Sequence, residues 1–217
     1  GNLYVVGLAG DAQASGEYNI FALRHRGDSW GNLWVTEIDG LRANSSQNFT
    51  SDGALVWGAK VSQDFRVKTR EIGTRLNIDP SWLMAVMAFE TGNTFSPSIK
   101  NPGSSATGLI QFLDKTAQSL GTTTAKLSRM TAVEQLDYVE KYFNQYKGRI
   151  NNLGDCYLAV FYPRAMGKPD TFIIATSPSA TYNANAGLDV NRDGTITRLE
   201  AISRVNDSFR RGQQYAK

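Results

Sequence analysis

A short segment near the middle of the chain, Trp82 to Glu90, is apolar on nearly every side of the helix that it predicts. A helix of this kind is covered by other elements over most of its surface, so we expect it at the centre of a helical domain. It is preceded by Ile78-Asp79-Pro80-Ser81, with a proline placed for a helix start, and it is ended by Thr91-Gly92-Asn93. The sequence therefore predicts a mainly α fold around this segment.

Other patterns divide the chain in two. Helical periodicity predicts further helices over 61–76, 107–120, 131–146, 155–162 and 199–209. The first 60 residues are instead rich in Gly, Asn and Ser, and we expect them to form a small β-rich or irregular N-terminal segment. Their β-type runs are Leu3–Val6, Tyr18–Leu23, Leu33–Thr36 and Leu55–Trp57.

Composition excludes several classes of site. The 217 residues include one cysteine, Cys156, and one histidine, His25, which excludes internal disulfides, cysteine-based zinc clusters and two-histidine metal sites. A net charge of +3 is too small to indicate a nucleic-acid partner. No stretch approaches the ~20 apolar residues of a membrane span, and no signal peptide is visible.

Glu90 is the polar residue in a run that otherwise belongs in a core. Burial disfavours an ionised carboxyl group, and the negative end of the helix dipole acts in the same direction. Both effects raise the pKa, as a general acid working near neutral pH requires. The helix alone leaves an alternative open, a glutamate at a frayed helix end that reaches solvent or pairs with an arginine.

The sequence after Glu90 carries an ordered set of motifs. A Phe-x-Pro turn at 95–97 is followed by a Gly/Ser loop at 103–105 and then by Gly108-Leu109-Ile110-Gln111 and Phe112. This ordered set resembles the lysozyme-like lytic transglycosylases, above all the phage-encoded branch of that superfamily. Small loop residues let sugar rings approach backbone N–H groups, and a glutamine amide both donates and accepts hydrogen bonds.

The resemblance implies that residues 61–217 form a lysozyme-like catalytic domain with Glu90 as the catalytic residue. The family usually shows Ala-x-x-x-Tyr-Asn-Ala-Gly near its cleft; Tyr162 matches that tyrosine by position, but Pro163-Arg164-Ala165 replaces Asn-Ala-Gly. The implied substrate-binding residues are Ser104, Ser105, Gln111, Phe112 and Tyr162.

Residues 189–200 fit the loop of a calcium-binding EF-hand. Gly194 stands at the sharp turn, and oxygen-bearing side chains or carbonyls stand at each ligand position, so we expect one structural Ca²⁺ ion. The alternative is a loop that matches the pattern without binding. The expected ligands are Asp189, Asn191, Asp193, Thr195, Thr197 and Glu200.

The function that this resemblance implies is cleavage of the MurNAc–GlcNAc β-1,4 bond of peptidoglycan with formation of 1,6-anhydroMurNAc. Ordinary glycosidases use a second carboxylate, and none stands out here, since Asp114 reads as a surface residue. Two alternatives remain open: a muramidase of the same fold, and a non-catalytic cell-wall-binding or virion structural protein.

The expected partners follow from this reading. They are peptidoglycan glycan strands, together with other virion proteins as candidate partners of residues 1–60, while the isolated domain is expected to be a monomer. We expect a phage-encoded protein that acts at the bacterial cell wall in the periplasm, either as part of the virion or after release from the host cytoplasm.

Overall fold

The computed structural model describes the backbone of residues 2–5, 16–27 and 34–42, and the backbone and side chains of residues 53–217. The chain divides into two compact units, residues 1–48 and 49–217. In the part of the chain that is described, no helix is both long enough and apolar enough to cross a membrane.

The first unit contains a three-stranded antiparallel sheet, in the order β1 (Asn2–Val5), β2 (Gly16–Gly27) and β3 (Trp34–Arg42). The pairing of β2 with β3 has one register irregularity. Three of the predicted β-type runs fall on these strands, although Val6 and Leu33 lie outside the described residues.

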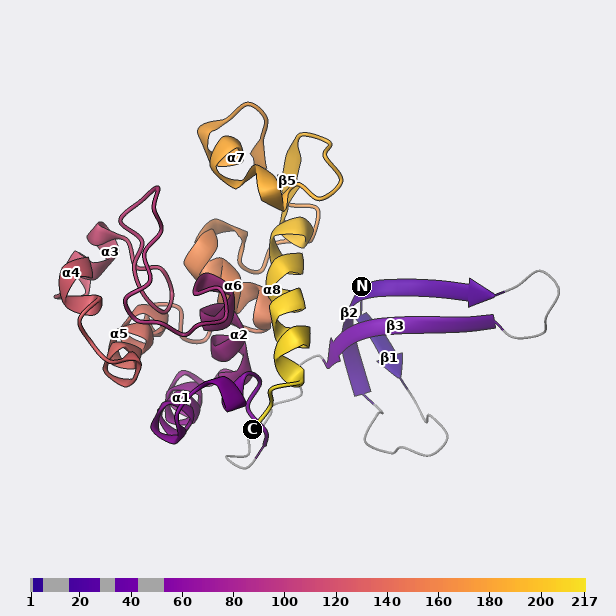
Figure 1. The fold of residues 1–217 in the computed structure, drawn as a ribbon. Helices are drawn as coiled ribbons and strands as arrows, with labels where there is room; N and C mark the ends of the chain where they lie inside the picture. The colour runs from indigo at the N-terminus through magenta and orange to yellow at the C-terminus, as the bar shows by residue number, and fades with distance from the viewer. Residues whose placement is uncertain (1, 6–15, 28–33, 43–52) are drawn as a thin grey trace. The chain divides into compact units, whose positions relative to one another are not determined.

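The second unit is helical, which confirms the mainly α fold (Figure 1). It also contains an antiparallel pair of short strands, β4 (Ile173–Thr176) and β5 (Thr195–Thr197). Single 3-10 turns are η2 (Gly58–Lys60), η3 (Pro163–Ala165) and η4 (Ala186–Leu188). The α-helices are α1 (Gln63–Leu76), α2 (Pro80–Glu90), α3 (Asp114–Ser119), α4 (Thr124–Leu127), α5 (Ala132–Asn144), α6 (Leu153–Phe161), α7 (Ala180–Asn185) and α8 (Arg198–Gln213).

Helix α2 is the centre of the second unit, as its apolar sequence predicts. It packs against α1, α6 and α8, and its residues 84–88 are completely buried (Figure 1). Asp79 caps its start by accepting a hydrogen bond from the Ser81 N–H at 2.7 Å, with Pro80 in the first turn. The catalytic candidate Glu90 is therefore the last residue of a deeply buried helix.

The predicted β-type run Leu55–Trp57 is not a strand of a sheet. Leu55 exchanges two backbone hydrogen bonds with Lys217, at 2.9 and 3.1 Å, and the Trp57 indole donates to the Ser208 carbonyl at 3.0 Å. The Trp57 ring also stacks on Tyr215. The prediction was wrong because the partner of this run is the C-terminal end of the chain, and the apolar side chains complete the helical core.

The predicted helix over 107–120 forms only at its end, as α3. Thr107 and Phe112 exchange two backbone hydrogen bonds, at 3.0 and 2.9 Å, which closes a tight loop where the helix was expected. Gly108 and Gln111 both have positive φ, at 80° and 52°, a conformation that no right-handed helix contains.

A buried glutamine holds this loop in place. Gln135 on α5 is fully buried and accepts a hydrogen bond from the Leu109 N–H at 2.6 Å. Its amide nitrogen donates to the carbonyls of Pro97 and Leu127, at 3.0 and 2.9 Å. A β-carbon on Gly108 would lie 2.3 Å from the Gln135 oxygen, so this close approach requires glycine.

Candidate active site

Glu90 carries its carboxyl group at the C-terminal end of α2, where it is half-buried. Among the described residues, this carboxyl group has no hydrogen-bond or ion-pair partner, so the alternative of pairing with an arginine is not observed, while its half-buried position leaves it partly open to solvent. Burial raises its pKa from 4.5 to about 7. Near neutral pH, Glu90 therefore exists in both its protonated and its ionised form.

The turn that follows Glu90 is fixed by Thr91, which is fully buried. The Thr91 hydroxyl donates to the Met87 carbonyl at 2.6 Å and accepts from the Phe95 N–H at 3.0 Å. Phe95 has a φ of 52° and is held there by burial against the edge of Phe65, with ring centroids 5.9 Å apart. The chain therefore passes directly from Glu90 into the loop over 95–112, which carries the sequence motifs.

Within that loop, Ser104 is exposed, while Ser105 and Gln111 are half-buried. The Ser105 hydroxyl oxygen accepts a hydrogen bond from the Asp114 N–H at 3.1 Å and keeps its proton for donation. The Gln111 amide nitrogen donates to the Gly108 carbonyl at 3.0 Å, which leaves its amide oxygen to accept hydrogen bonds. These side chains offer both donors and acceptors, as a sugar hydroxyl or amide requires.

The two aromatic candidates differ in their surroundings. Phe112 is only 1% exposed and packs edge-on against Tyr142, with ring centroids 6.4 Å apart. We therefore assign Phe112 to the core and no longer to the substrate contacts. Tyr162 is half-buried and follows the last residue of α6, with Pro163 directly after it.

Two other tyrosines lie in the electrostatic field of Glu90. Burial raises the pKa of Tyr142 on α5 and of Tyr157 on α6, and the Glu90 charge adds to both shifts. The Tyr157 ring packs against Phe89, the residue before Glu90, with centroids 5.3 Å apart. The sequence did not identify either tyrosine, because an aromatic residue on the apolar face of a helix reads as core.

No second carboxylate among the described residues shifts the pKa of Glu90. Asp114, the nearest downstream acid, is exposed and accepts a hydrogen bond from the Thr124 hydroxyl at 2.5 Å. Its role is to connect the start of α3 to α4. Glu90 thus stands as a single ionisable carboxyl group in this part of the site.

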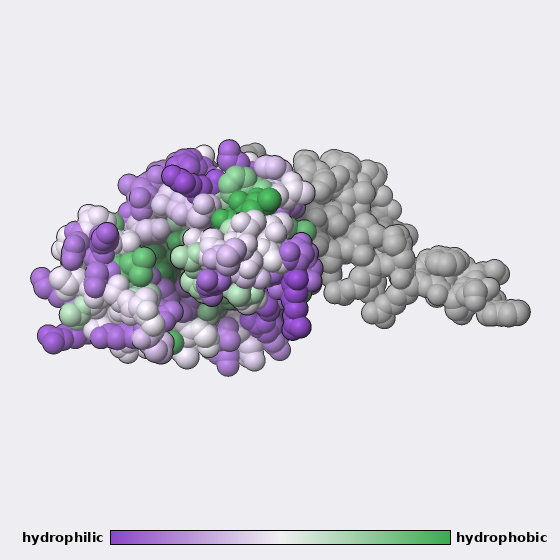
Figure 2. All heavy atoms as spheres, turned by 90° about the horizontal axis from the view of Figure 1, so that it is seen from above, coloured by the Kyte–Doolittle hydropathy of each residue, from purple (hydrophilic) through white to green (hydrophobic). Residues whose placement is uncertain are grey.

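The surface of the described residues is hollowed between two lobes, one carrying α3 and α4 and the other carrying α7 and β5 (Figure 2). Hydrophobic residues show at the floor of this hollow, and polar residues dominate its rim (Figure 2). An apolar floor with a polar rim suits the faces and the hydroxyl groups of a sugar chain.

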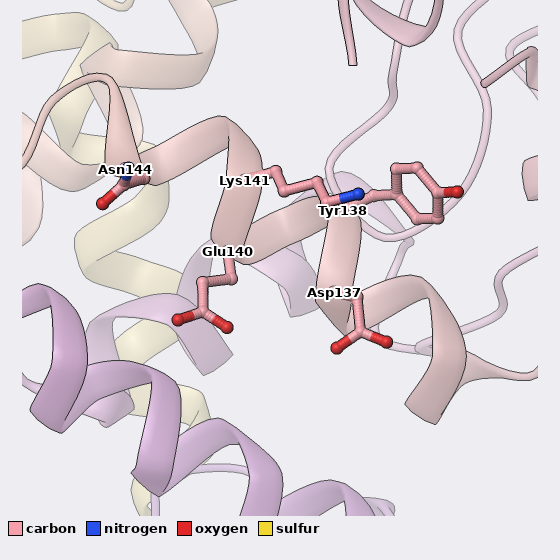
Figure 3. Close-up of a pocket in the computed structure, with 5 residues that line it drawn as sticks. All are labelled: Asp137, Tyr138, Glu140, Lys141 and Asn144. Carbon is pink, nitrogen blue, oxygen red and sulfur yellow. The ribbon is translucent and has the colours of Figure 1, made fainter. Parts of the chain in front are cut away.

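A pocket of about 550 Å³ is lined by residues of α5, and none of the sequence-predicted site residues lines it (Figure 3). Its two acids point toward α1, where Asp137 pairs with Lys68 at 2.7 Å and Glu140 pairs with Arg75 at 2.6 Å. We therefore assign it no part in the site around Glu90. Its lining residues are Asp137, Tyr138, Glu140, Lys141 and Asn144.

The loop over 189–200 is closed by hydrogen bonds between its side chains and its own backbone. Asp189 accepts from the Gly194 N–H at 2.9 Å and Asp193 accepts from the Thr195 N–H at 2.8 Å, while Gly194 has a φ of 84°. Glu200 accepts from the Thr197 N–H at 2.9 Å and completes a capping box at the start of α8.

The donor chemistry of this loop fits a hard cation, but its carboxylates do not converge. Among the described residues, no three Asp, Glu, His or Cys side chains lie close enough together to hold a metal ion. Tyr182 donates a hydrogen bond to Asp189 at 2.7 Å, which occupies one candidate ligand oxygen. Ile196 is buried in β5, which pairs with β4 and not with a second EF-hand loop.

The raised pKa of Glu90 predicts how stability depends on pH. An unfolded glutamate ionises at 4.5, whereas folded Glu90 keeps its proton up to about pH 7. The folded state binds the extra proton between these values, so the unfolding free energy should fall as pH rises through this window, by up to about 3 kcal/mol. Urea unfolding at pH 5 and pH 8 measures it. In Glu90→Gln this component should disappear, and an unchanged pH dependence would contradict the assignment.

Comparison with protein families identifies this region. The family model described as the transglycosylase SLT domain matches residues 69–187, more than half of the chain. The match includes Glu90, the motif loop and Tyr162, and it ends before the loop over 189–200. No curated protein matches the chain.

Proposed function

We propose a lytic transglycosylase function for this chain, which belongs to the transglycosylase SLT domain family. Members of the family are enzymes that cleave the glycan strands of cell-wall peptidoglycan. The proposed reaction breaks the MurNAc–GlcNAc β-1,4 bond and closes a 1,6-anhydro ring on the MurNAc residue.

In this mechanism Glu90 serves twice. Its protonated carboxyl group gives its proton to the glycosidic oxygen as the bond to C1 breaks. The resulting carboxylate then takes the proton of the MurNAc C6 hydroxyl, whose oxygen attacks C1 and closes the ring. The carboxyl group ends protonated, as it began, and its pKa of about 7 makes both transfers accessible near neutral pH.

The observation that carries the proposal is the isolation of Glu90. A hydrolase of this type activates water or forms a covalent intermediate with a second carboxylate, at a separation of about 5 to 9.5 Å. Among the described residues, no carboxylate contributes to the raised pKa of Glu90 or forms a hydrogen bond with it, so no second acid is in close contact with Glu90. An intramolecular nucleophile removes the need for one, which favours the lyase over a muramidase of the same fold.

The residues that we propose to contact the substrate in this reaction are Ser104, Ser105, Gln111 and Tyr162. The first three lie on the loop that Gln135 and Thr91 hold next to the end of α2. We further propose, from the resemblance of the motifs, that the protein is phage-encoded and acts on the wall in the periplasm, as a virion component or an endolysin. Residues 1–60 would then serve attachment to other virion proteins.

Digestion of purified peptidoglycan sacculi tests whether the protein has the proposed enzymatic activity. The protein should release soluble muropeptides at a rate proportional to enzyme concentration, measured by the loss of turbidity and by chromatography of the supernatant. Sedimentation of the protein with sacculi, without any release of muropeptides, would support the non-catalytic wall-binding alternative and contradict the proposed activity.

We also propose that the loop over 189–200 binds one structural Ca²⁺ ion. The support is the fit of every loop position to the ligand pattern, together with the turn at Gly194. Binding would draw the Asp189, Asp193 and Glu200 carboxylates from their present hydrogen bonds onto the ion. The ion is assigned no step of the reaction.

Calcium at about 100 times its Kd should then raise the Tm of the protein by about 5 to 10 °C, because a ligand that binds only the folded state stabilises it. Differential scanning calorimetry with and without a chelator measures the shift. Asp193→Ala should abolish it, while Asp207→Ala, an exposed acid on α8, should retain it. Equal Tm values in calcium and chelator would contradict the proposal.

A further inference from the structure

Two central helices, α2 and α6, change from buried to half-buried at their C-terminal ends. Residues 81–88 of α2 are buried, whereas Phe89 and Glu90 are half-buried. Residues 153–159 of α6 are likewise buried, whereas its last two residues, 160–161, are half-buried. Each helix therefore presents its last two residues, one of them a phenylalanine, partly at the surface of the domain.

Tyr157 connects these two helix ends through its ring. It packs edge-on against Phe89 of α2, with ring centroids 5.3 Å apart and an interplanar angle of 89°. It also stacks on Phe161, one turn later on α6, with centroids 5.5 Å apart and an interplanar angle of 8°. The Phe161 ring is therefore only two ring contacts away from Phe89, the residue that directly precedes Glu90.

The Phe161 ring has the properties of a platform for a flat apolar partner. One of its faces lies on Tyr157, which fixes the orientation of the ring. Among the described residues it makes no other ring contact, and it is half-buried, so part of its surface is open to a ligand. A pyranose ring carries C–H groups on its faces and stacks on aromatic rings through them. Because the platform is already fixed, little freedom is lost when a sugar binds to it.

The Tyr157 hydroxyl group is the polar component of the same cluster. Tyr157 is only 2% exposed, and its hydroxyl has no hydrogen-bond partner among the described residues. In that part of the chain, the only fully enclosed side-chain oxygen or nitrogen without a partner is that of Thr122, so the Tyr157 oxygen remains accessible to a ligand. Burial raises the pKa of Tyr157, so the hydroxyl keeps its proton and both donates and accepts hydrogen bonds.

We propose that Phe161 and Tyr157 form a subsite for one amino-sugar ring of a glycan strand, next to the end of α2: the sugar stacks on the open face of Phe161, and the Tyr157 hydroxyl bonds one of its polar groups. Neither side chain carries a charge, which suits a sugar ring better than the carboxylates of a peptide stem. The assignment of this ring to peptidoglycan rests on the proposed function, but the binding of an amino-sugar chain is measured without it.

Isothermal titration calorimetry with the tetramer of β-1,4-linked N-acetylglucosamine tests the subsite, because this probe has the sugar rings of a glycan strand without peptide stems. Phe161→Leu keeps an apolar side chain and removes the flat ring, and the Kd should rise about tenfold. Tyr157→Phe keeps the rings and removes only the hydroxyl, and the Kd should rise about three- to tenfold. The matched controls are Phe209→Leu on α8 and Tyr138→Phe on α5, which should leave the Kd unchanged.

The Tm of Tyr157→Phe separates a binding role of the hydroxyl from a structural one. Because the hydroxyl has no partner among the described residues, its removal should not lower the Tm. A Tm that falls by several degrees, together with an unchanged Kd for the tetramer, would show that the hydroxyl is structural and would overturn the inference.

The outcomes also distinguish the subsite from the proposed function. If both variants lose affinity for the tetramer but the wild type releases no muropeptides from sacculi, the subsite is upheld and the proposed function is rejected. If the wild type releases muropeptides and both variants bind the tetramer as tightly as it does, the subsite is rejected and the function stands. A wild type that does not bind the tetramer at millimolar concentration would also overturn the subsite.

Discussion

Glu90→Gln is expected to reduce the release of muropeptides by about 100-fold or more, toward the background rate. Glutamine has nearly the same shape, but it neither gives a proton to the leaving oxygen nor takes one from the C6 hydroxyl. Because Glu90 has no carboxylate neighbour among the described residues that would take over either transfer, the loss should be severe. The turbidity assay on sacculi measures it.

The matched control is Glu71→Gln, the same chemical change on the exposed side of α1. It should leave the rate unchanged. Circular dichroism and the Tm should show that Glu90→Gln is folded, and above pH 7 this variant should be at least as stable as the wild type, because it no longer ionises a half-buried carboxyl group. Activity of Glu90→Gln equal to that of the control would show that another residue is the general acid.

The second large effect is expected at Arg198, the first residue of α8. Its guanidinium group is buried and donates to Asp155 at 3.1 Å, to Asp170 at 2.6 Å and to the Ala165 carbonyl at 3.2 Å. Arg198→Met should lower the unfolding free energy by about 3 to 5 kcal/mol, because it leaves the Asp155 carboxylate buried without a cation. Urea unfolding followed by tryptophan fluorescence measures this difference.

Two further variants make the result interpretable. Arg210→Met, at an exposed position of the same helix, should cost less than 1 kcal/mol. Arg198→Met combined with Asp155→Leu should recover most of the lost stability, since both buried charges are then absent. If Arg198→Met alone costs no more than Arg210→Met, the network does not stabilise the junction of α6, η3 and α8.

The parts of the fold that the sequence predicted correctly are those determined by neighbouring residues. Helix α2 was predicted because its apolar run and its Asp79-Pro80 start are local signals. The run Leu55–Trp57 and the loop at 107–112 were predicted wrongly, because their partners are distant in sequence. Leu55 pairs with Lys217, and Gln135 holds the loop in place. No local sequence pattern indicates either contact.

The same distinction applies to the site. Glu90 was found because a carboxyl group in an apolar helix is a local anomaly, and its raised pKa agrees with that reasoning. Tyr142 and Tyr157 were not found, because their electrostatic coupling to Glu90 depends on where α5 and α6 lie in the folded domain. Phe112 illustrates the converse: its place in the motif indicated a sugar contact, whereas its contact with Tyr142 places it in the core.

We expect Glu90 to transfer protons to and from the glycan itself, without water as nucleophile. Digestion of sacculi in water enriched in heavy oxygen, followed by mass spectrometry of the muropeptides, tests it most directly. The expected products are anhydro-muropeptides, each lighter by one water than a reducing-end product and free of the heavy isotope. Reducing MurNAc ends that carry heavy oxygen would show hydrolysis and contradict it.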